Sequence, residues 1–235
     1  MTGTPPGRQT FAVIDTAALR HNFAQIRARV PAEVGILAVV KANAYGHGAP
    51  IVAPVLEQAG ATAFGVATIG EAVELRNAGI NQPIVVLAGV GGRDIAAVQS
   101  HRISVTLTHP ELAAELGAAA RGHRLRVHLK IDSGMGRLGA TPAELPHLLD
   151  AVVAAGNLDV EGVFSHFGDA DNVFTPHCEG QVAAFHAGLE IVGQRGWTST
   201  SIWCALESRS TGSRPRVSPA STCGPSCAWS PMSFR

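Results

Sequence analysis

The sequence predicts a parallel α/β fold, in which strands alternate with helices that pack on a sheet. Three observations support this: six short apolar runs, amphipathic stretches between them, and polar residue pairs that fit helix starts. A doubly wound sheet and a (β/α)8 TIM-type barrel both accommodate the pattern. We favour the barrel because the chemically interesting residues follow several different strands, whereas a doubly wound sheet gathers them at one switch point.

The six apolar runs have the length of buried strands. They are residues 36–40, 63–66, 84–87, 104–107, 127–131 and 160–165. A closed barrel needs eight strand–helix units. We therefore expect an incomplete barrel, with about six of the eight units.

Helices are expected between the runs. Apolar residues recur at helical spacing between residues 19 and 30 and again between residues 182 and 192. Three Thr/Glu pairs with a spacing of three fit the capping box that opens a helix. The pairs are Thr68/Glu71, Thr108/Glu111 and Thr141/Glu144.

Composition excludes several classes of function. The formal net charge is zero with the histidines neutral, which gives no attraction to nucleic acid or an anionic membrane. No apolar run approaches the roughly 20 residues that a membrane span needs, and the first residues lack a signal-peptide core. We expect a cytoplasmic protein. The four cysteines match no zinc pattern, so no metal is expected.

Lysine is rare in this chain. Lys41 and Lys130 are its two lysines, and the other sixteen of the 18 Lys and Arg residues are arginines. Lys41 follows the apolar run 36–40 and precedes a glycine-containing loop with room for a ligand. An amine at the end of a buried strand loses hydration, which favours the neutral form that Schiff-base chemistry requires. Spacing alone also fits a lysine that closes a strand and extends its amine into solvent.

Two further segments place candidate groups at strand ends. Residues 128–139 put Lys130 in a strand and Arg137 in a loop with three glycines, where backbone and ligand can approach closely. The rigid guanidinium of Arg137 suits an oxygen anion. His166 ends the run that begins at residue 160. Taken alone, the arginine also fits a solvated turn and the histidine a structural residue.

The residue patterns of these segments resemble motifs of the alanine racemases, which are pyridoxal-phosphate enzymes of fold type III. Val-Val-Lys-Ala-Asn-Ala-Tyr-Gly-His-Gly, at residues 39–48, looks like the family's cofactor-lysine motif. Lys-x-Asp-Ser-Gly-Met-Gly-Arg-x-Gly at 130–139 and Ser-His-Phe at 165–167 resemble two more of its motifs, and residues 13–22 resemble its opening strand and helix. We therefore assign residues 1–196 to a pyridoxal-phosphate-binding barrel domain of this type.

The resemblance implies a role for each candidate residue. Lys41 would hold pyridoxal phosphate and act as a catalytic base, and Tyr45 would contact the cofactor phosphate. Arg137 would lie beside the cofactor phenol oxygen and the substrate carboxylate, and His166 beside the cofactor ring. Lys130 would be carbamylated, so that its new negative charge orients Arg137. The implied reaction interconverts L-alanine and D-alanine, which in the family supplies D-alanine for peptidoglycan.

The resemblance stops after residue 196. The family continues with two more barrel strands and a β-rich C-terminal domain, which in its homodimers gives a catalytic tyrosine to the partner subunit. No motif of these elements is recognisable in residues 197–235. This segment is an irregular tail that holds ten of the fourteen serines. When residues 202–208 are translated back into codons and the reading frame is shifted by one, some codon choices encode Leu-Val-Arg-Pro-Gly-Ile. This peptide matches one of the family's missing strands. We hypothesise that a deletion joined residue 196 to a shifted reading frame; a genuine tail is the alternative.

Three functions follow from these observations. The leading one is a pyridoxal-phosphate-dependent alanine racemase that acts on alanine, impaired by the loss of later elements. The first alternative is a non-catalytic protein that binds pyridoxal phosphate for carriage or homeostasis. The second is an inactive fragment, because a barrel without two strands has two exposed edges and an open core.

Overall fold

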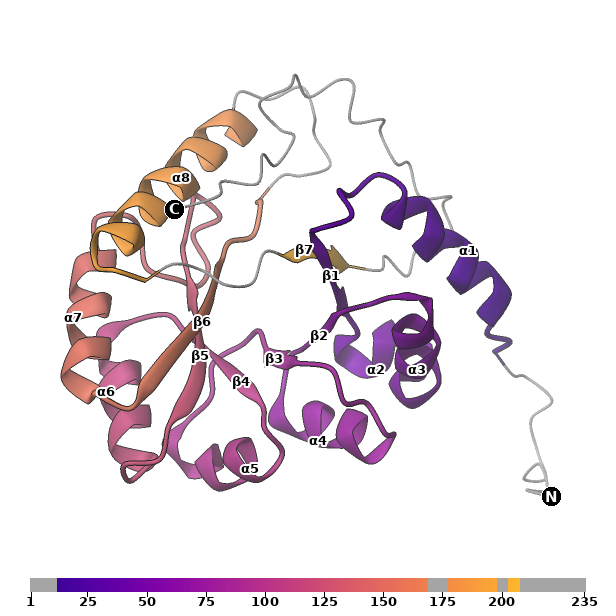
Figure 1. Ribbon diagram of the computed structural model, residues 1–235, viewed down its shortest axis with the longest axis horizontal. Helices are drawn as coiled ribbons and strands as arrows, with labels where there is room; N and C mark the ends of the chain where they lie inside the picture. Colours follow the sequence, from indigo (N-terminus) through magenta and orange to yellow (C-terminus); the bar gives the residue numbers. More distant parts are fainter. Residues whose placement is uncertain (1–11, 169–176, 198–202, 208–235) are drawn as a thin grey trace.

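A curved parallel sheet with helices on its outer side forms the centre of the protein (Figure 1). This computed structural model describes residues 12–168, 177–197 and 203–207. The strands are β1 (Gly35–Val39), β2 (Ala63–Val66), β3 (Ile84–Val86), β4 (Ser104–Leu107), β5 (Leu125–Lys130), β6 (Leu158–Phe164) and β7 (Trp203–Glu207). Their order in the sheet is β6-β5-β4-β3-β2-β1-β7, and every pair is parallel.

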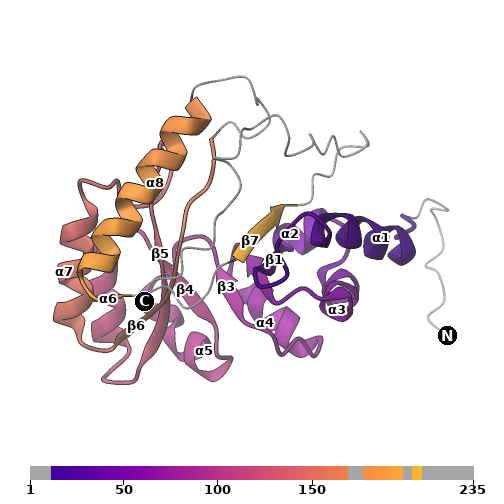
Figure 2. The ribbon, with the colours of Figure 1, turned by 45° about the horizontal axis from the view of Figure 1, so that its top comes forward.

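The helices follow the strands in regular alternation. They are α1 (Thr16–Arg27), α2 (Lys41–Tyr45), α3 (Ala49–Ala59), α4 (Ile69–Asn77), α5 (Ile95–Ser100), α6 (Pro110–Ala119), α7 (Leu145–Ala155) and α8 (His177–Gln194), with a 3-10 turn at Gly92–Asp94. Strands β1 to β6 are neighbours in chain order, and α3 to α8 lie around one side of the sheet (Figures 1 and 2). The incomplete barrel is thus confirmed, and the doubly wound alternative, with helices on both faces, is wrong.

The two faces of the sheet bury different side chains. The main core lies between the outer face and the helices, and strand residues such as Ile36, Val105 and Leu129 belong to it. Because neighbouring residues of a strand point to opposite faces, the alternate positions face inward. Near β1 to β3 these form a second apolar cluster of Leu37, Val39, Ala63 and Val85. Inward positions on β4 and β5 are polar instead, and they are Ser104, Thr106, Arg126, His128 and Lys130.

A β-bulge shapes the last of the six consecutive strands. Val127 pairs with Val160, but His128 pairs with Gly162, so that Glu161 is an extra residue in β6. A bulge redirects the side chain it carries. Here Glu161 Oε2 accepts a hydrogen bond of 2.7 Å from the Ser104 hydroxyl and lies 3.7 Å from His128 Nε2.

The predicted capping boxes have three different outcomes. Thr68 and Glu71 form the complete box at the start of α4. Thr141 and Glu144 exchange the expected bonds, but in the turn before α7, which begins at Leu145. The prediction for Thr108 is wrong: α6 begins at Pro110 with His109 as its N-cap, and the Thr108 hydroxyl lies 2.8 Å from His109 Nδ1.

One strand was not predicted from the sequence. Residues 203–207 form β7, which pairs in parallel with β1 over its full length. It occupies the position beside β1 that the last strand of a closed barrel would take. The rest of the segment 198–235 lies outside the described residues. Among the helices that the structure describes, none is long and apolar enough to cross a membrane.

Candidate functional site

Lys41 begins a strained turn at the carboxyl end of β1. The backbone of the next four residues is left-handed, with φ of 51° at Ala42, 54° at Asn43, 53° at Ala44 and 55° at Tyr45. Left-handed backbone costs an L-residue with a side chain roughly 1–2 kcal/mol. Such a run persists only where surrounding contacts determine it, which is typical of functional sites.

Side chains from neighbouring elements hold this turn. Glu71, at the start of α4, accepts hydrogen bonds of 2.7 Å from the backbone N–H groups of Ala42 and Ala67. Asn43 Oδ1 accepts another of 2.7 Å from the N–H of Ala49, where α3 begins. The loops after β1 and β2 are therefore joined through one carboxylate.

The turn brings two predicted cofactor residues together. Lys41 Nζ lies 5.8 Å from the centre of the Tyr45 ring, and both residues are half-buried. The ring also packs against the inward apolar cluster of β1 to β3. An amine and a phenol thus emerge side by side from the apolar half of the barrel.

Lys130 lies at the same end of the barrel, at the end of β5. Its side chain is only 6% exposed, and its Nζ sits 4.7 Å from the centre of the Phe164 ring. Burial and the positive charges of Arg137 and Lys41 lower the pKa of Lys130, Asp132 opposes them, and the net pKa is about 8. A substantial share of this amine is therefore neutral near pH 8.

The loop that carries Arg137 is organised around Asp132. Burial alone would raise the pKa of Asp132, but hydrogen bonds from the backbone N–H groups of Gly134, Gly136 and Met135 outweigh it and lower the pKa. The aspartate therefore stays negative inside the loop. Arg137 is exposed and lines a hollow of about 350 Å3 with Thr108 and His109.

Two polar contacts join this loop to the end of β6. The hydroxyls of Ser133 and Ser165 lie 2.7 Å apart, and Ser165 directly precedes His166 in the chain. Gln181, from α8, is 2% exposed and accepts a hydrogen bond of 3.2 Å from the Gly168 N–H. A Cβ on Gly134 would stand 3.3 Å from Gln181 Cγ, so that this side chain contacts both loops.

The structure therefore gathers the predicted residues at the carboxyl ends of three strands: Lys41 and Tyr45 after β1, Lys130 and Arg137 with β5, and His166 after β6. Arg137 and Lys41 both act electrostatically on the Lys130 amine, and each lowers its pKa. Within the described part of the chain, no group of three or more His, Cys, Asp or Glu side chains could hold a metal ion.

Sequence reasoning missed the residues that support this arrangement. Glu71 gave a helix-start signal, but nothing in the pattern shows that its second oxygen reaches the Lys41 turn. Ser133 and Gln181 act across long sequence separations and carry no local signal. Glu161 faces His128 because of a bulge, which residue spacing does not reveal.

A curved parallel sheet, helices on its outer side and charged groups at the carboxyl ends of its strands define a barrel domain of an enzyme. Residues 14–216 match the model of the alanine racemase N-terminal domain. The chain therefore belongs to the alanine racemase family.

Similar proteins agree with this assignment. The alanine racemase of Citrifermentans bemidjiense is 40% identical over 208 residues, which are 84% of this chain and 54% of that protein. The one from Geobacter sulfurreducens is 44% identical over 168 residues, 71% of this chain and 44% of that protein. The chain thus spans about half the length of the curated relatives it matches.

Solved structures show the same likeness. The alanine racemase of Bacillus anthracis, crystallised with bound L-Ala-P, superposes with a TM-score of 0.83 at 32% identity, over 91% of this chain and 60% of that one. The enzyme of Streptomyces lavendulae gives a TM-score of 0.77 at 38% identity, over 82% of this chain and 51% of that one.

Proposed function

We propose that this chain binds pyridoxal phosphate through Lys41 and forms the cofactor-binding part of a cytoplasmic alanine racemase that interconverts L-alanine and D-alanine. The observation that carries the proposal is the strained turn that fixes Lys41 beside Tyr45 at the carboxyl end of β1. Membership of the alanine racemase family supports it.

The chemistry of the donors fits the proposed cofactor. Pyridoxal phosphate presents an aldehyde, a phenol oxygen and a phosphate, and it therefore needs a primary amine and groups that tolerate negative charge. Lys41 supplies the amine, and the phenol of Tyr45 supplies a hydrogen-bond donor from the same turn. Arg137 and His166 supply further donors from the β5 and β6 ends. When bound, the cofactor supplies an electron sink for the carbanion at the amino-acid Cα.

The residues of this chain would divide the work as follows. The Lys41 amine holds the cofactor and moves the proton at Cα on one face of the substrate. Arg137 binds the substrate carboxylate with its rigid pair of donors. The Lys130 amine, neutral in part near pH 8, forms an N–C bond with carbon dioxide and releases a proton. The resulting carbamate is negative, and it would turn repulsion between Lys130 and Arg137 into attraction.

Borohydride reduction followed by peptide mapping tests the cofactor assignment. Reduction fixes pyridoxal phosphate to whichever amine it has joined, and the chain offers two lysines. We expect the label on the peptide that contains Lys41, and Lys41→Arg should abolish it while keeping the positive charge. A label on Lys130 with Lys41 unmodified would overturn the proposal.

A non-catalytic pyridoxal-phosphate protein is the second candidate. One observation favours it: Tyr45 is the single tyrosine of the 235 residues, and its proposed position is at the phosphate. Racemisation needs a base on each face of Cα, and loss of one such base costs about 100- to 10,000-fold in rate. We therefore expect little racemase activity from this chain alone, without a partner subunit's tyrosine. Exchange of the α-proton of each alanine enantiomer in heavy water measures it; turnover like that of a full-length racemase would exclude this candidate.

We also infer that residues 1–196 and 197–235 have different origins, the second by translation in a shifted frame. The serine-rich composition of residues 197–235 supports this, while the match to the alanine racemase N-terminal domain extends to residue 216. Sequencing the gene tests it: an unshifted reading across codons 196–204, with no deletion, would contradict the inference.

A further inference from the structure

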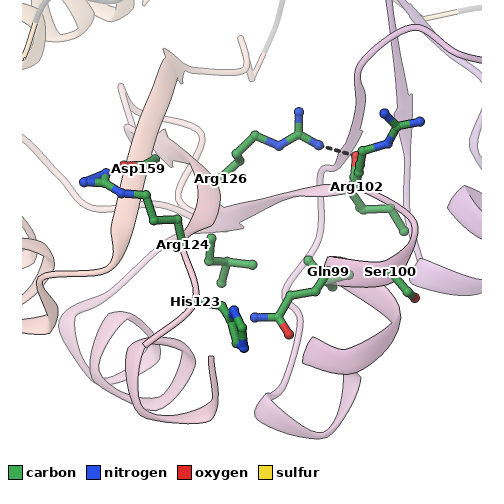
Figure 3. Close-up of a pocket in the computed structure, with 10 residues that line it drawn as sticks. Gln99, Ser100, Arg102, His123, Arg124, Arg126 and Asp159 are labelled. Carbon is green, nitrogen blue, oxygen red and sulfur yellow. Dashed lines mark hydrogen bonds and ion pairs between the residues drawn. The ribbon is translucent and has the colours of Figure 1, made fainter. Parts of the chain in front are cut away.

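A basic hollow lies at the end of the sheet opposite Lys41, where β4, β5 and β6 begin (Figure 3). Its volume is about 650 Å3, within the usual range for small-molecule sites. Arg126, in its wall, precedes Lys130 by four positions along β5, which corresponds to roughly 13 Å. This arginine hollow is therefore separate from the candidate active site. Its polar lining residues are Gln99, Ser100, Arg102, His123, Arg124, Arg126 and Asp159.

Positive charge exceeds negative charge around the hollow. Arg124 forms an ion pair with Asp159, and Arg126 Nε lies 3.7 Å from Glu161 Oε1. Arg102 forms no ion pair with a carboxylate in the described part of the chain, and its side chain is exposed to solvent. Figure 3 shows Arg124 directed to Asp159 on one side, with Gln99 extending toward His123 on another.

Arg76 adds a fourth guanidinium behind the wall. Its nitrogens donate to four backbone carbonyls, those of Ile80, Gln82, His101 and Arg102, at 2.7 to 3.1 Å. These acceptors are neutral, so that Arg76 ties loop ends together without losing its charge. The pKa of Arg76 is lowered, first by burial and then by the positive charges of Arg102 and Arg126. The negative charge of Glu57 opposes this and has the smallest influence.

The backbone fixes Arg102 at the rim. Its φ is 50°, in the left-handed region, and its carbonyl accepts hydrogen bonds from the guanidiniums of both Arg76 and Arg126. The backbone of Arg102 is thus held by the fold, whereas its charged side chain is available. Cations that are crowded together without matching carboxylates repel one another, and a bound anion removes that repulsion.

We propose that the arginine hollow binds a phosphate dianion, either inorganic phosphate or the phosphate of a small phosphomonoester. Arg102, Arg124 and Arg126 line the hollow against the carboxylates of Asp159 and Glu161, and Arg76, which Glu57 opposes, lies behind them. A net positive charge therefore remains for a phosphate group, which carries a charge of about −2 near pH 7. Planar guanidiniums from separate elements match its oxygens. Val98, Ile103 and Leu125 form the buried apolar base of the hollow.

Calorimetric titration of the chain with inorganic phosphate, at constant ionic strength, tests this proposal. We expect saturable binding that Arg102→Asn weakens about tenfold or more, since a charge-assisted contact is lost. Asn tolerates a left-handed backbone, and Arg102→Gly repeats the test with a residue that prefers it. Arg121 is the matched control: it is an exposed arginine with φ of 49° that lies outside the hollow. Arg121→Asn should change affinity less than about twofold.

The proposed cofactor site would also bind phosphate, so the location of binding is measured separately. In 15N-labelled chain, phosphate should shift the side-chain Nε–H signals of Arg102 and Arg126. The proposal fails if wild-type binding is not saturable, if Arg121→Asn weakens it as much as Arg102→Asn, or if the shifts are confined to the Lys41 turn. Adenosine 5′-monophosphate distinguishes the two sources: tighter binding than phosphate assigns the hollow to an ester, and equal or weaker binding to inorganic phosphate.

Discussion

The inner face of the sheet has an apolar half on β1 to β3 and a polar half on β4 to β6. Leu37, Val39, Ala63 and Val85 fill the first half by packing alone. The second half contains Ser104, Arg126, His128, Lys130 and Glu161, which must satisfy one another's charges and hydrogen bonds. Buried polar groups are costly unless paired. The two halves should therefore differ in how much change they tolerate.

This difference also separates the two lysines. Lys41 leaves the apolar half on a turn that Glu71 of α4 holds from outside and that its own Asn43 side chain joins to the start of α3. Lys130 remains within the polar half, 6% exposed, and its pKa reflects that burial. In the proposed function, one half presents the Lys41 amine for chemistry, and the other holds the Lys130 amine that would orient Arg137.

Glycine substitutions on the inner face should show the largest effect. A Cβ on Gly162 would lie 2.5 Å from His128 Nδ1, a ring that is held beside Glu161. A Cβ on Gly65 would lie 2.9 Å from the ends of Leu37 and Leu87, which are flexible side chains. We expect Gly162→Ala to lower the free energy of unfolding by about 3 kcal/mol and Gly65→Ala by about 1 kcal/mol or less.

Urea denaturation of both variants measures the difference. The two substitutions are the same, so their effects on the unfolded chain cancel to a first approximation. Equal losses for Gly162→Ala and Gly65→Ala would show that His128 moves as easily as a leucine end, and the contrast between the two halves would fail.

The apolar half could be predicted from sequence more fully than the polar half. The predicted runs 36–40, 63–66 and 84–87 coincide with β1 to β3 within one residue at either end. Such strands are buried on both faces, and continuous apolar runs are their signature. On β5 the alternation predicts the strand but starts it two residues late, because Leu125 and Arg126 precede the run at 127–131.

Strain, bulges and the supporting contacts could not be predicted. Nothing in Ala-Asn-Ala-Tyr indicates four consecutive left-handed residues, because none of them is glycine; tertiary contacts through Glu71 determine the turn. No pattern in residues 203–207 indicates β7, because its pairing with β1 depends on the free edge of that strand. The arginine hollow unites residues from 98 to 159 and has no linear motif.

The second largest effect concerns Lys130. In buffer free of carbon dioxide, we expect Lys130→Met to raise the free energy of unfolding at pH 7 by on the order of 2 kcal/mol, since it removes a desolvated charge. The folded-state pKa of about 8 is below the ordinary value of 10.5, so the unfolded state binds more protons between these values. Wild-type stability should therefore rise relative to the variant from pH 8 to pH 10.5.

Urea denaturation at pH 7, 8, 9 and 10 measures the difference in free energy of unfolding between the wild type and Lys130→Met. Leu37→Met is the matched control from the apolar half: it also introduces methionine at an inward position, and it should give a gap independent of pH. A gap for Lys130→Met that stays constant from pH 7 to pH 10 would show that its amine is not desolvated in solution.

The smallest effect should come from Glu161, and it has the opposite dependence on pH. Burial raises the pKa of Glu161, but the neighbouring His128, the hydrogen bond from Ser104 and the charge of Arg126 outweigh this and lower it below its ordinary value of 4.5. A lowered pKa means that the carboxylate stabilises the fold above the unfolded-state value of about 4.5, and that this contribution is lost as pH falls through the folded-state pKa. Glu161→Gln keeps an acceptor for Ser104 but loses the charge, and it should cost about 1 kcal/mol at pH 7, because the side chain is 31% exposed and partly screened. Urea denaturation at pH 7 and at successively lower pH should show the two proteins converging. If the cost is the same at every pH, the carboxylate acts by shape rather than charge, and the polar half is packed like the apolar one.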